Sequence, residues 1–372
     1  MATLNFQPDY SLVTAILPKD SANDILKKVI PGNIHTDIII NARGTLYRDK
    51  WYQKFTPSVS PEQTVLEMLV PENYAASLMD NISIAGNLHD SGNGAVYSVK
   101  CEKALFLKNM DFGFPVEKMS NETVQYKNNL TGIFCIIQKN MAEGVATAAI
   151  RAGSAGPTVV FGQGCGVRDK IGILRIAISP EKELIRVVVD HYDTEPVFEA
   201  MVKEGKLDTP GMGFIYVMPV EKGIVNIAGV AAGINKLASI HQIIKAIDEL
   251  KGGSTWRTQG DGGNKKQRKF LSDLTRLSCV VERGKGDTLV QAAMGAGAPG
   301  ASITYGIEGG GAMQKEGSAI AVNREMEIIE LTLAPDTLEN VVSVMLDAAE
   351  KENNSDIYFY TQPVPKALTY LG

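Results

Sequence analysis

The sequence predicts an α+β protein built from three copies of one module, each with the element order β-α-β-β-α-β. Three short segments rich in β-forming residues resemble one another, and each precedes a helix-like stretch. They are residues 12–17, 133–137 and 277–281. The number of positions between each segment and a lysine that follows a later strand-like segment is nearly constant. It is 90 positions from Val13 to Lys103, 88 from Phe134 to Lys222 and 87 from Cys279 to Lys366. Chance resemblance would not keep this spacing, so we expect three modules of about 100 residues each.

The second copy shows the elements most clearly, because runs of β-branched residues alternate with apolar residues at helical spacing. The predicted elements are a strand at 132–138, a helix at about 141–151, strands at 158–162 and 184–189, a helix at about 195–204 and a strand at 214–220. Gly153 ends the first helix. This order places both helices on one face of an antiparallel sheet, so neighbouring modules are expected to cover the other face.

The predicted modules span residues 1–108, 130–230 and 274–372. Residues 231–273 form an insertion between the second and third modules. Apolar residues at helical spacing predict a helix over its first part, which ends at Gly252. The following stretch, residues 258–269, is basic and rich in glycine, and it has no periodicity, which indicates a flexible loop.

Composition and charge exclude several classes of function. The 372 residues are 44% hydrophobic and 21% charged, which is enough apolar material for a core. The net charge of −5 argues against nucleic acid or a membrane surface as partner. No apolar run reaches the roughly 18 residues of a membrane span, and the first residues show no signal-peptide pattern. The four cysteines form no closely spaced pair, which indicates reduced thiols and a cytoplasmic location.

Glycines recur at two corresponding places in the modules and are the candidate ligand-binding residues. The first place follows the second strand and holds Gly44 in the first copy, Gly162, Gln163 and Gly164 in the second, and Gly306, Glu308 and Gly309 in the third. The second place precedes the fourth strand and holds Gly92 and Gly94 in the first copy and Gly211 and Gly213 in the second. Glycines let consecutive N–H groups point to one side and bind phosphate. The alternative is that they form tight turns that need positive φ angles.

The second copy contains three motifs, AGPTVVFGQG at 155–164, PEKELIRVVV at 180–189 and GMGFIYVMPVEK at 211–222, and its candidate glycines lie in the first and the third. With these motifs the module resembles the P-II nitrogen-regulatory signalling family. The resemblance implies a ferredoxin-like module, three of which form a trimer with inward-facing sheets and nucleotides in clefts between subunits. For this chain it implies a pseudo-threefold trimer made by a single polypeptide.

The chain departs from the family at the positions that hold phosphate. Family members that bind ATP carry a lysine just after the second glycine turn, where this chain has Ala95, Phe214 and, in the third copy, Asp356 followed by Ile357. Two arginines usually follow the fourth strand, and here only Lys108 is basic. Cations beside the first glycine place could supply charge instead, namely Arg43, Arg48, Arg168, Lys170, Lys315 and Arg324. We therefore expect a small anion as regulatory ligand, an adenine nucleotide (AMP, ADP or ATP), with tightly held ATP disfavoured.

The main hypothesis is a non-catalytic cytoplasmic regulatory protein. Ligand binding would order the excursions at 44–63, 162–183 and 308–324, which would then present a changed surface to a target protein such as a transporter or a metabolic enzyme. The alternative is an interaction scaffold whose nucleotide clefts have degenerated. An enzyme that uses Cys165 or the acidic groups near Asp190 is a third hypothesis, but no complete catalytic or metal-binding set is visible. Asp190 is interpreted as a helix cap, and Cys101, Cys135 and Cys279 as core residues.

Overall fold

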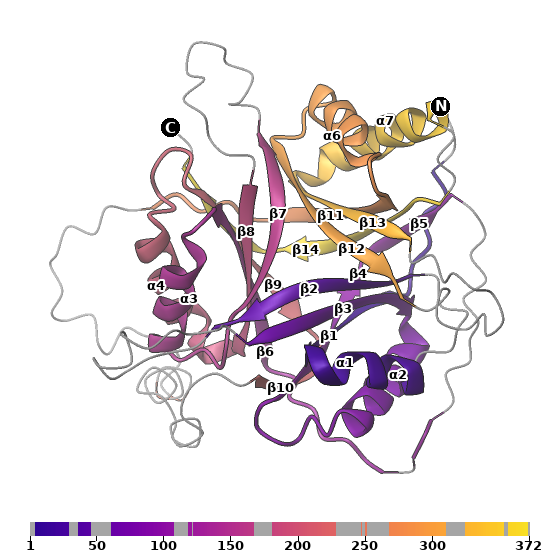
Figure 1. Cartoon of the computed structure of the whole chain (residues 1–372). Coiled ribbons are helices and arrows are strands. Elements are labelled where there is room, and N and C mark those ends of the chain that lie inside the picture. Colours follow the sequence, from indigo (N-terminus) through magenta and orange to yellow (C-terminus); the bar gives the residue numbers. More distant parts are fainter. Residues whose placement is uncertain are drawn as a thin grey trace, which may run out of the picture.

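The structure is a computed structural model. It describes residues 4–29, 36–45, 61–107, 118–120, 122–166, 181–227, 247, 250, 268–309, 324–352 and 356–370. Within these residues one order of seven elements occurs three times, and we call the three sets units 1, 2 and 3. In Figure 1 each unit contributes strands to a central sheet and a pair of helices to the periphery.

The units have closely similar element lengths. Unit 1 contains β1 (Tyr10–Pro18), α1 (Lys19–Val29), β2 (Asp37–Gly44), β3 (Glu62–Pro71), α2 (Glu72–Ala85), β4 (Asn93–Cys101) and β5 (Lys103–Phe106). Unit 2 contains β6 (Leu130–Gln138), α3 (Ala142–Arg151), β7 (Thr158–Gly166), β8 (Glu181–Asp190), α4 (Thr194–Gly205), β9 (Gly213–Val220) and β10 (Lys222–Ile227). Unit 3 contains β11 (Leu274–Glu282), α6 (Gly286–Gly295), β12 (Gly300–Glu308), β13 (Glu325–Leu333), α7 (Leu338–Lys351), β14 (Tyr358–Val364) and β15 (Lys366–Thr369).

The first four strands of each unit form an antiparallel sheet. Its order is β4-β1-β3-β2 in unit 1, and the corresponding strands pair in the same way in units 2 and 3. The first strand of each unit, β1, β6 or β11, lies inside the sheet and is buried along nearly its whole length. A strand covered on both faces has no polar side to alternate with, which explains the continuous apolar runs in the sequence.

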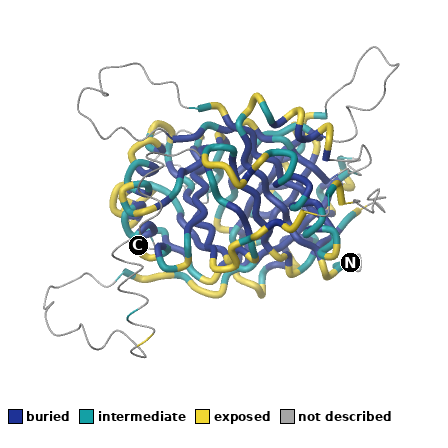
Figure 2. Tube along the Cα trace, turned by 90° about the horizontal axis from the view of Figure 1, so that it is seen from below, coloured by how far each residue is buried: buried dark blue, intermediate teal, exposed yellow. Residues whose placement is uncertain are grey.

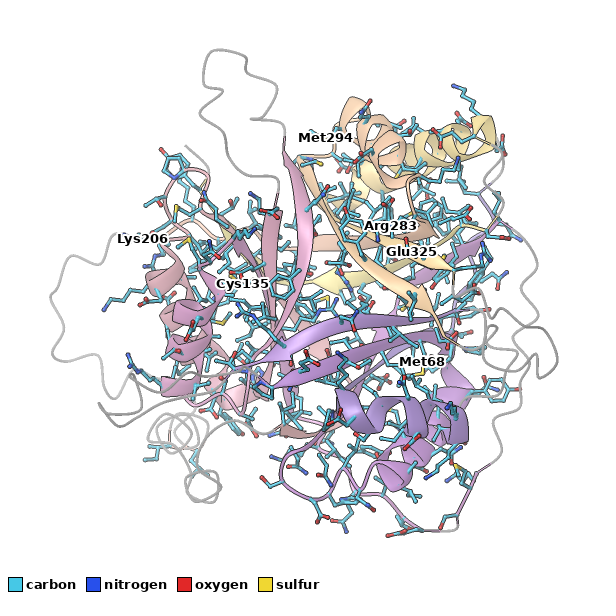
Figure 3. All side chains as sticks on the ribbon, in the orientation of Figure 1. Met68, Cys135, Lys206, Arg283, Met294 and Glu325 are labelled. Carbon is cyan, nitrogen blue, oxygen red and sulfur yellow. The ribbon has the colours of Figure 1, made fainter. Side chains whose placement is uncertain are left out.

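The helices pack on the outer face of each unit's sheet. In unit 2, α3 buries Val145 and Ala149, and α4 buries Phe198 and Met201, against the apolar side chains of the strands. Small residues in α3 let this helix lie close to the sheet and to α4. Figure 2 shows the buried chain in the interior and the exposed chain around the rim.

The fifth strand of each unit extends the sheet of a neighbouring unit. β10 of unit 2 pairs with β4 of unit 1, β5 of unit 1 with β14 of unit 3, and β15 of unit 3 with β9 of unit 2. The outer edge of each fifth strand is covered by a bridge with two backbone hydrogen bonds. The bridges are Gln7–Ala104, Lys127–Gly223 and Leu271–Ala367. The three units therefore exchange strands in a closed cycle.

The second strands close a second cycle. The end of β2 pairs with the start of β7, the end of β7 with the start of β12, and the end of β12 with the start of β2. All three pairings are antiparallel. Together the two cycles join the strands of all three units into one large curled sheet of 15 strands.

The predicted α+β class with repeated β-α-β units is confirmed. Two predictions about local structure were wrong or incomplete. β7 continues to Gly166 and β12 to Glu308, because a strand from the next unit pairs there. The glycine loop predicted at 162–166 and the first part of that predicted at 306–311 are therefore strand. The fifth strands were not predicted. Most of the predicted insertion at 231–273 lies outside the described residues.

Candidate functional site: the boundaries between units

The glycines of the first predicted group lie at the crossing points of the second strands. A Cβ atom on Gly162 would lie 2.5 Å from the carbonyl oxygen of Ile303 in unit 3. A Cβ atom on Gly306 would lie 2.9 Å from the carbonyl oxygen of Ile39 in unit 1. These glycines are therefore needed for the close approach of strands from neighbouring units. Their backbone takes part in strand pairing, so they lie in strands and not in an open loop.

The other members of this group lie at the ends of the same strands. Gly44 is the last residue of β2. Gln163 and Gly164 lie in β7, and the side chain of Lys182 covers Gly164, since a Cβ atom there would lie 2.8 Å from Lys182 Cγ. Gly309 directly follows β12, and its N–H donates to the carbonyl oxygen of Asp37 at 3.2 Å.

The glycines of the second predicted group form turns that need positive φ angles. Gly92, Gly94, Gly211 and Gly213 have φ values of 100°, 126°, 73° and 154°. Gly94 and Gly213 occupy corresponding positions, where a Cβ atom would collide with the carbonyl oxygen of Ile16 or Ile136. The turn alternative therefore accounts for these glycines. The corresponding turn of unit 3 includes residues 353–355, which lie outside the described residues.

At the boundary of units 1 and 2, Asn226 of unit 2 satisfies hydrogen-bonding groups of the turn around Gly92 in unit 1. Asn226 Nδ2 donates to the carbonyl oxygens of Leu88 at 2.6 Å and His89 at 3.2 Å. The N–H of Gly92 donates to the carbonyl oxygen of Asn226 at 2.8 Å. The Gly92 N–H is thus already used by the protein and does not point at a ligand.

At the boundary of units 2 and 3, side chains likewise form hydrogen bonds with the backbone of the glycine turn. Thr369 Oγ1, in β15, donates to the carbonyl oxygen of Gly213 at 2.9 Å, and Gln138 Nε2 donates to that of Gly211 at 2.8 Å. Lys182 contributes a positive charge beside Gly164 at this same boundary. Both glycine-bearing places of unit 2 therefore border unit 3.

The arginines that could neutralise an anion are paired with carboxylates. Arg43 Nη2 lies 3.1 Å from Glu183 Oε1 of unit 2, and the Arg43 guanidinium lies 5.3 Å from the centre of the Phe161 ring. Arg324 lies 3.5 Å from Glu308 and 2.9 Å from Asp356. The predicted candidates Arg48, Lys108, Arg168, Lys170 and Lys315 lie outside the described residues.

The boundary of units 3 and 1 is acidic. Glu308 is 8% exposed and Asp37 is 1% exposed, and both lie near Gly309. Arg324 is the cation that neutralises Glu308 here. Two buried carboxylates disfavour a phosphate group at this place, because like charges repel strongly in a medium of low dielectric constant.

The predicted roles of the cysteines and of Asp190 agree with the structure. Cys101, Cys135 and Cys279 are buried, and Cys165 is half-buried. Burial raises the pKa of Cys101 to about 12 and raises the pKa of Cys135 above its ordinary value. Asp190 caps a short helical turn by accepting a hydrogen bond from the Tyr192 N–H at 3.1 Å. Within the described part of the chain, no group of three His, Cys, Asp or Glu residues could hold a metal ion.

A buried cluster of charged residues, which was not predicted from the sequence, lies between the units. Its members are Glu67, Arg186, Arg276 and Glu330, each at most 6% exposed. Arg186 forms an ion pair with Glu67, and Arg276 forms one with Glu330. Burial alone would lower the pKa of Arg186, but Glu67 and Glu330 raise it above its ordinary value. The signal in the sequence that could have revealed this cluster is that each of these charged residues interrupts an apolar strand, namely β3, β8, β11 or β13.

No family model and no curated protein matches the sequence. Among solved structures, aspartate kinase from Synechocystis has a TM-score of 0.20 at 9% identity, over 97% of this chain and 52% of the kinase chain. A chlorite dismutase from Candidatus Nitrospira defluvii has a TM-score of 0.16 at 11% identity, over 63% of this chain and 92% of the other. This chain thus spans about half the length of the kinase, and the likeness is too low to indicate function. In the described part of the chain, no helix is long and apolar enough to span a membrane.

Proposed function

We propose that the protein is a non-catalytic cytoplasmic regulator of the P-II type, in which three ferredoxin-like modules form a pseudo-threefold trimer within one chain. The observation that carries this proposal is the pair of closed strand cycles. Each unit gives its fifth strand to one neighbour, and the second strands meet end to start around the ring. Such a ring creates three boundaries from corresponding elements, and a single chain lets their residues differ.

The boundary of units 2 and 3 is the proposed site for a small anionic metabolite, an adenine nucleotide. Gly164 and the turn of Gly211 and Gly213 border this boundary, and Lys182 supplies a cation beside Gly164. Lysine is a common ligand of phosphate. The boundary of units 3 and 1 is less suited because of its buried carboxylates.

Signalling would use the segments between the second and third strands. Their described ends lie at corresponding places, between β2 and β3, between β7 and β8, and between β12 and β13. A ligand at the end of β7 would touch the base of the segment that follows it. If the ligand bound one conformation of that segment more tightly than another, it would shift the segment towards that conformation and so change the surface that a target protein contacts.

A second candidate, an interaction scaffold without a ligand, is favoured by the internal contacts at the boundaries. Arg43 and Arg324 are paired with carboxylates, and Asn226 fills the hydrogen bonds of the first turn. An anion would have to displace these contacts. The two candidates agree on the ring and differ on ligand binding.

Isothermal titration calorimetry with AMP, ADP and ATP separates the two candidates. The test variant is Gly164→Ala, because the three atoms nearest to its Cβ atom would all belong to the flexible Lys182 side chain, the first at 2.8 Å. We expect at least a tenfold weaker Kd with little loss of stability. Gly144→Ala is the matched control, since its Cβ atom would lie 3.2 Å from the Glu204 side chain, away from the boundary. The absence of heat with all three nucleotides at millimolar concentration would reject the ligand and favour the scaffold.

A further inference from the structure

The buried charges occupy corresponding positions in the three units. Glu67 pairs with Thr14 across β3 and β1, Arg186 with Phe134 across β8 and β6, and Glu330 with Ser278 across β13 and β11. On the other side, Thr14, Phe134 and Ser278 pair with three tyrosines. These are Tyr97, Tyr216 and Tyr360. The register thus places glutamate, arginine and glutamate at one position of the repeated module.

These three side chains meet in the interior, although they come from three units. Arg186 forms an ion pair with Glu67 of unit 1, and its Nη2 atom lies 3.8 Å from Glu330 Oε1 of unit 3. Arg276 adds a second cation from unit 3, pairing with Glu330 and donating a hydrogen bond to Gln362. Two arginines therefore balance two glutamates in a region closed to water.

The same charged residue in all three units would not be tolerated at this position. Three copies of unit 1 would bring three glutamates together, and three copies of unit 2 would bring three arginines together. An isolated buried charge is very costly, and like charges add repulsion to that cost. Units 1 and 2 therefore each offer a surface that fits the other units and repels a copy of itself, whereas unit 3 carries one charge of each sign.

We propose that the cluster of Glu67, Arg186, Arg276 and Glu330 selects the partners of units 1 and 2, so that a ring does not close from copies of unit 1 alone or of unit 2 alone. The partner recognised by unit 2 is a carboxylate-bearing face, and the partner recognised by unit 1 is an arginine-bearing face. This selection permits ring closure within one chain and disfavours rings assembled from several copies of unit 1 or of unit 2. The inference does not depend on any ligand.

Another set of contacts, made within each unit at its fifth strand, lacks this selectivity and serves as a comparison. Lys103, Lys222 and Lys366 stand at corresponding positions at the start of the fifth strands. Each ammonium group lies over an aromatic ring directly before the bridge residue of its own unit. The ring centres of Phe6, Tyr126 and Phe270 lie 5.0, 5.6 and 4.3 Å away. Because every unit carries the same lysine, these contacts stabilise a ring of any composition.

The test uses full-length chains with charge reversals. E67R leaves three arginines facing one glutamate, and R186E leaves three glutamates facing one arginine. Each single variant should lose roughly 5–10 °C of thermal midpoint or fail to fold. The double variant E67R/R186E restores the balance of charge and should recover at least half of the loss. K366M should lower the midpoint as well, but neither reversal should rescue it.

Partner selection also predicts rescue between chains. When E67R and R186E chains are refolded together, unit 1 of each chain meets a complementary unit 2 in the other chain. We expect a dimer of exchanged units by native mass spectrometry, with a midpoint above that of either variant refolded alone. The wild-type chain should give one species without exchange. If the double variant is no more stable than the singles, or the mixture forms no dimer, the cluster does not select partners.

Discussion

Glu183 joins a helix of its own unit to a strand of the next, and its removal tests how the units are held together. The side chain is buried, with 2% exposure, in β8. Its Oε2 atom accepts a hydrogen bond from the N–H of Ala142, the first residue of α3, at 2.8 Å. Its Oε1 atom lies 3.1 Å from Arg43 Nη2 of unit 1. Replacement by alanine removes both contacts.

The expected loss follows from three contributions. A buried N–H without a partner costs about 1–3 kcal/mol. Loss of a negative charge at a helix N-terminus costs about 0.3–1 kcal/mol. The ion pair adds at most about 1 kcal/mol, because the Arg43 side chain is 31% exposed and therefore screened by solvent. Glu183→Ala should thus lower the free energy of unfolding by about 1–5 kcal/mol.

Urea unfolding and differential scanning calorimetry measure this loss. For a chain of this size we expect the thermal midpoint to fall by roughly 2–6 °C. Glu62→Ala is the control, because Glu62 pairs with Lys19 at 2.6 Å on the surface, where its side chain is 63% exposed; it should cost less than about 1 kcal/mol. Glu327→Ala removes the corresponding carboxylate of unit 3 and should cost about as much as Glu183→Ala. Equal losses for Glu183→Ala and Glu62→Ala would refute the reasoning.

Three further predictions concern packing, charge and pH. Gly162→Val should cost about 1–3 kcal/mol in urea unfolding, because its Cβ atom would push against the Ile303 carbonyl oxygen at 2.5 Å. Lys366→Met should lower the thermal midpoint more than Lys139→Met, since Lys366 contacts Glu195 at 2.7 Å as well as two rings, whereas Lys139 forms one surface ion pair; equal shifts would contradict this. Burial raises the pKa of Cys101 from 9.0 to about 12, so the folded chain holds this proton more tightly. That contribution to stability is complete below pH 9 and should be lost as the pH rises from 9 towards 12, as thermal midpoints across this range would show.

Much of the fold could be predicted because it depends on local patterns. The apolar run of β6 and the small-residue helix α3 each carry their signal within about ten residues. The position of Lys222 relative to Phe134 repeats in the other two units, and this repetition alone indicated three modules. Asp190 could be interpreted as a cap because capping needs only the next two residues.

The glycine loops were misinterpreted because the deciding partner is distant in sequence. Gly162 and Gly306 look like turn residues when their own neighbours are considered. In the structure each is approached by the backbone of another unit, at Ile303 and Ile39 respectively. A strand that is completed only by another unit has no complete local signal, and the fifth strands were missed for the same reason.

The candidate site illustrates a more general limit of prediction from repeats. Residues that are alike in all units, such as Lys103, Lys222 and Lys366, can be found by comparing the copies. The role of residues that differ between the units can be seen only once the contacts between the units are known. Glu67 and Arg186 differ at one position because the two side chains face each other, and identical residues there would repel. In a tandem protein of this kind, the residues that determine specificity are therefore those that differ between the copies. Ile357 is another such residue, because it occupies the position of Gly94 and Gly213 in the other units. The turn of unit 3 is therefore the next place to look for a functional difference.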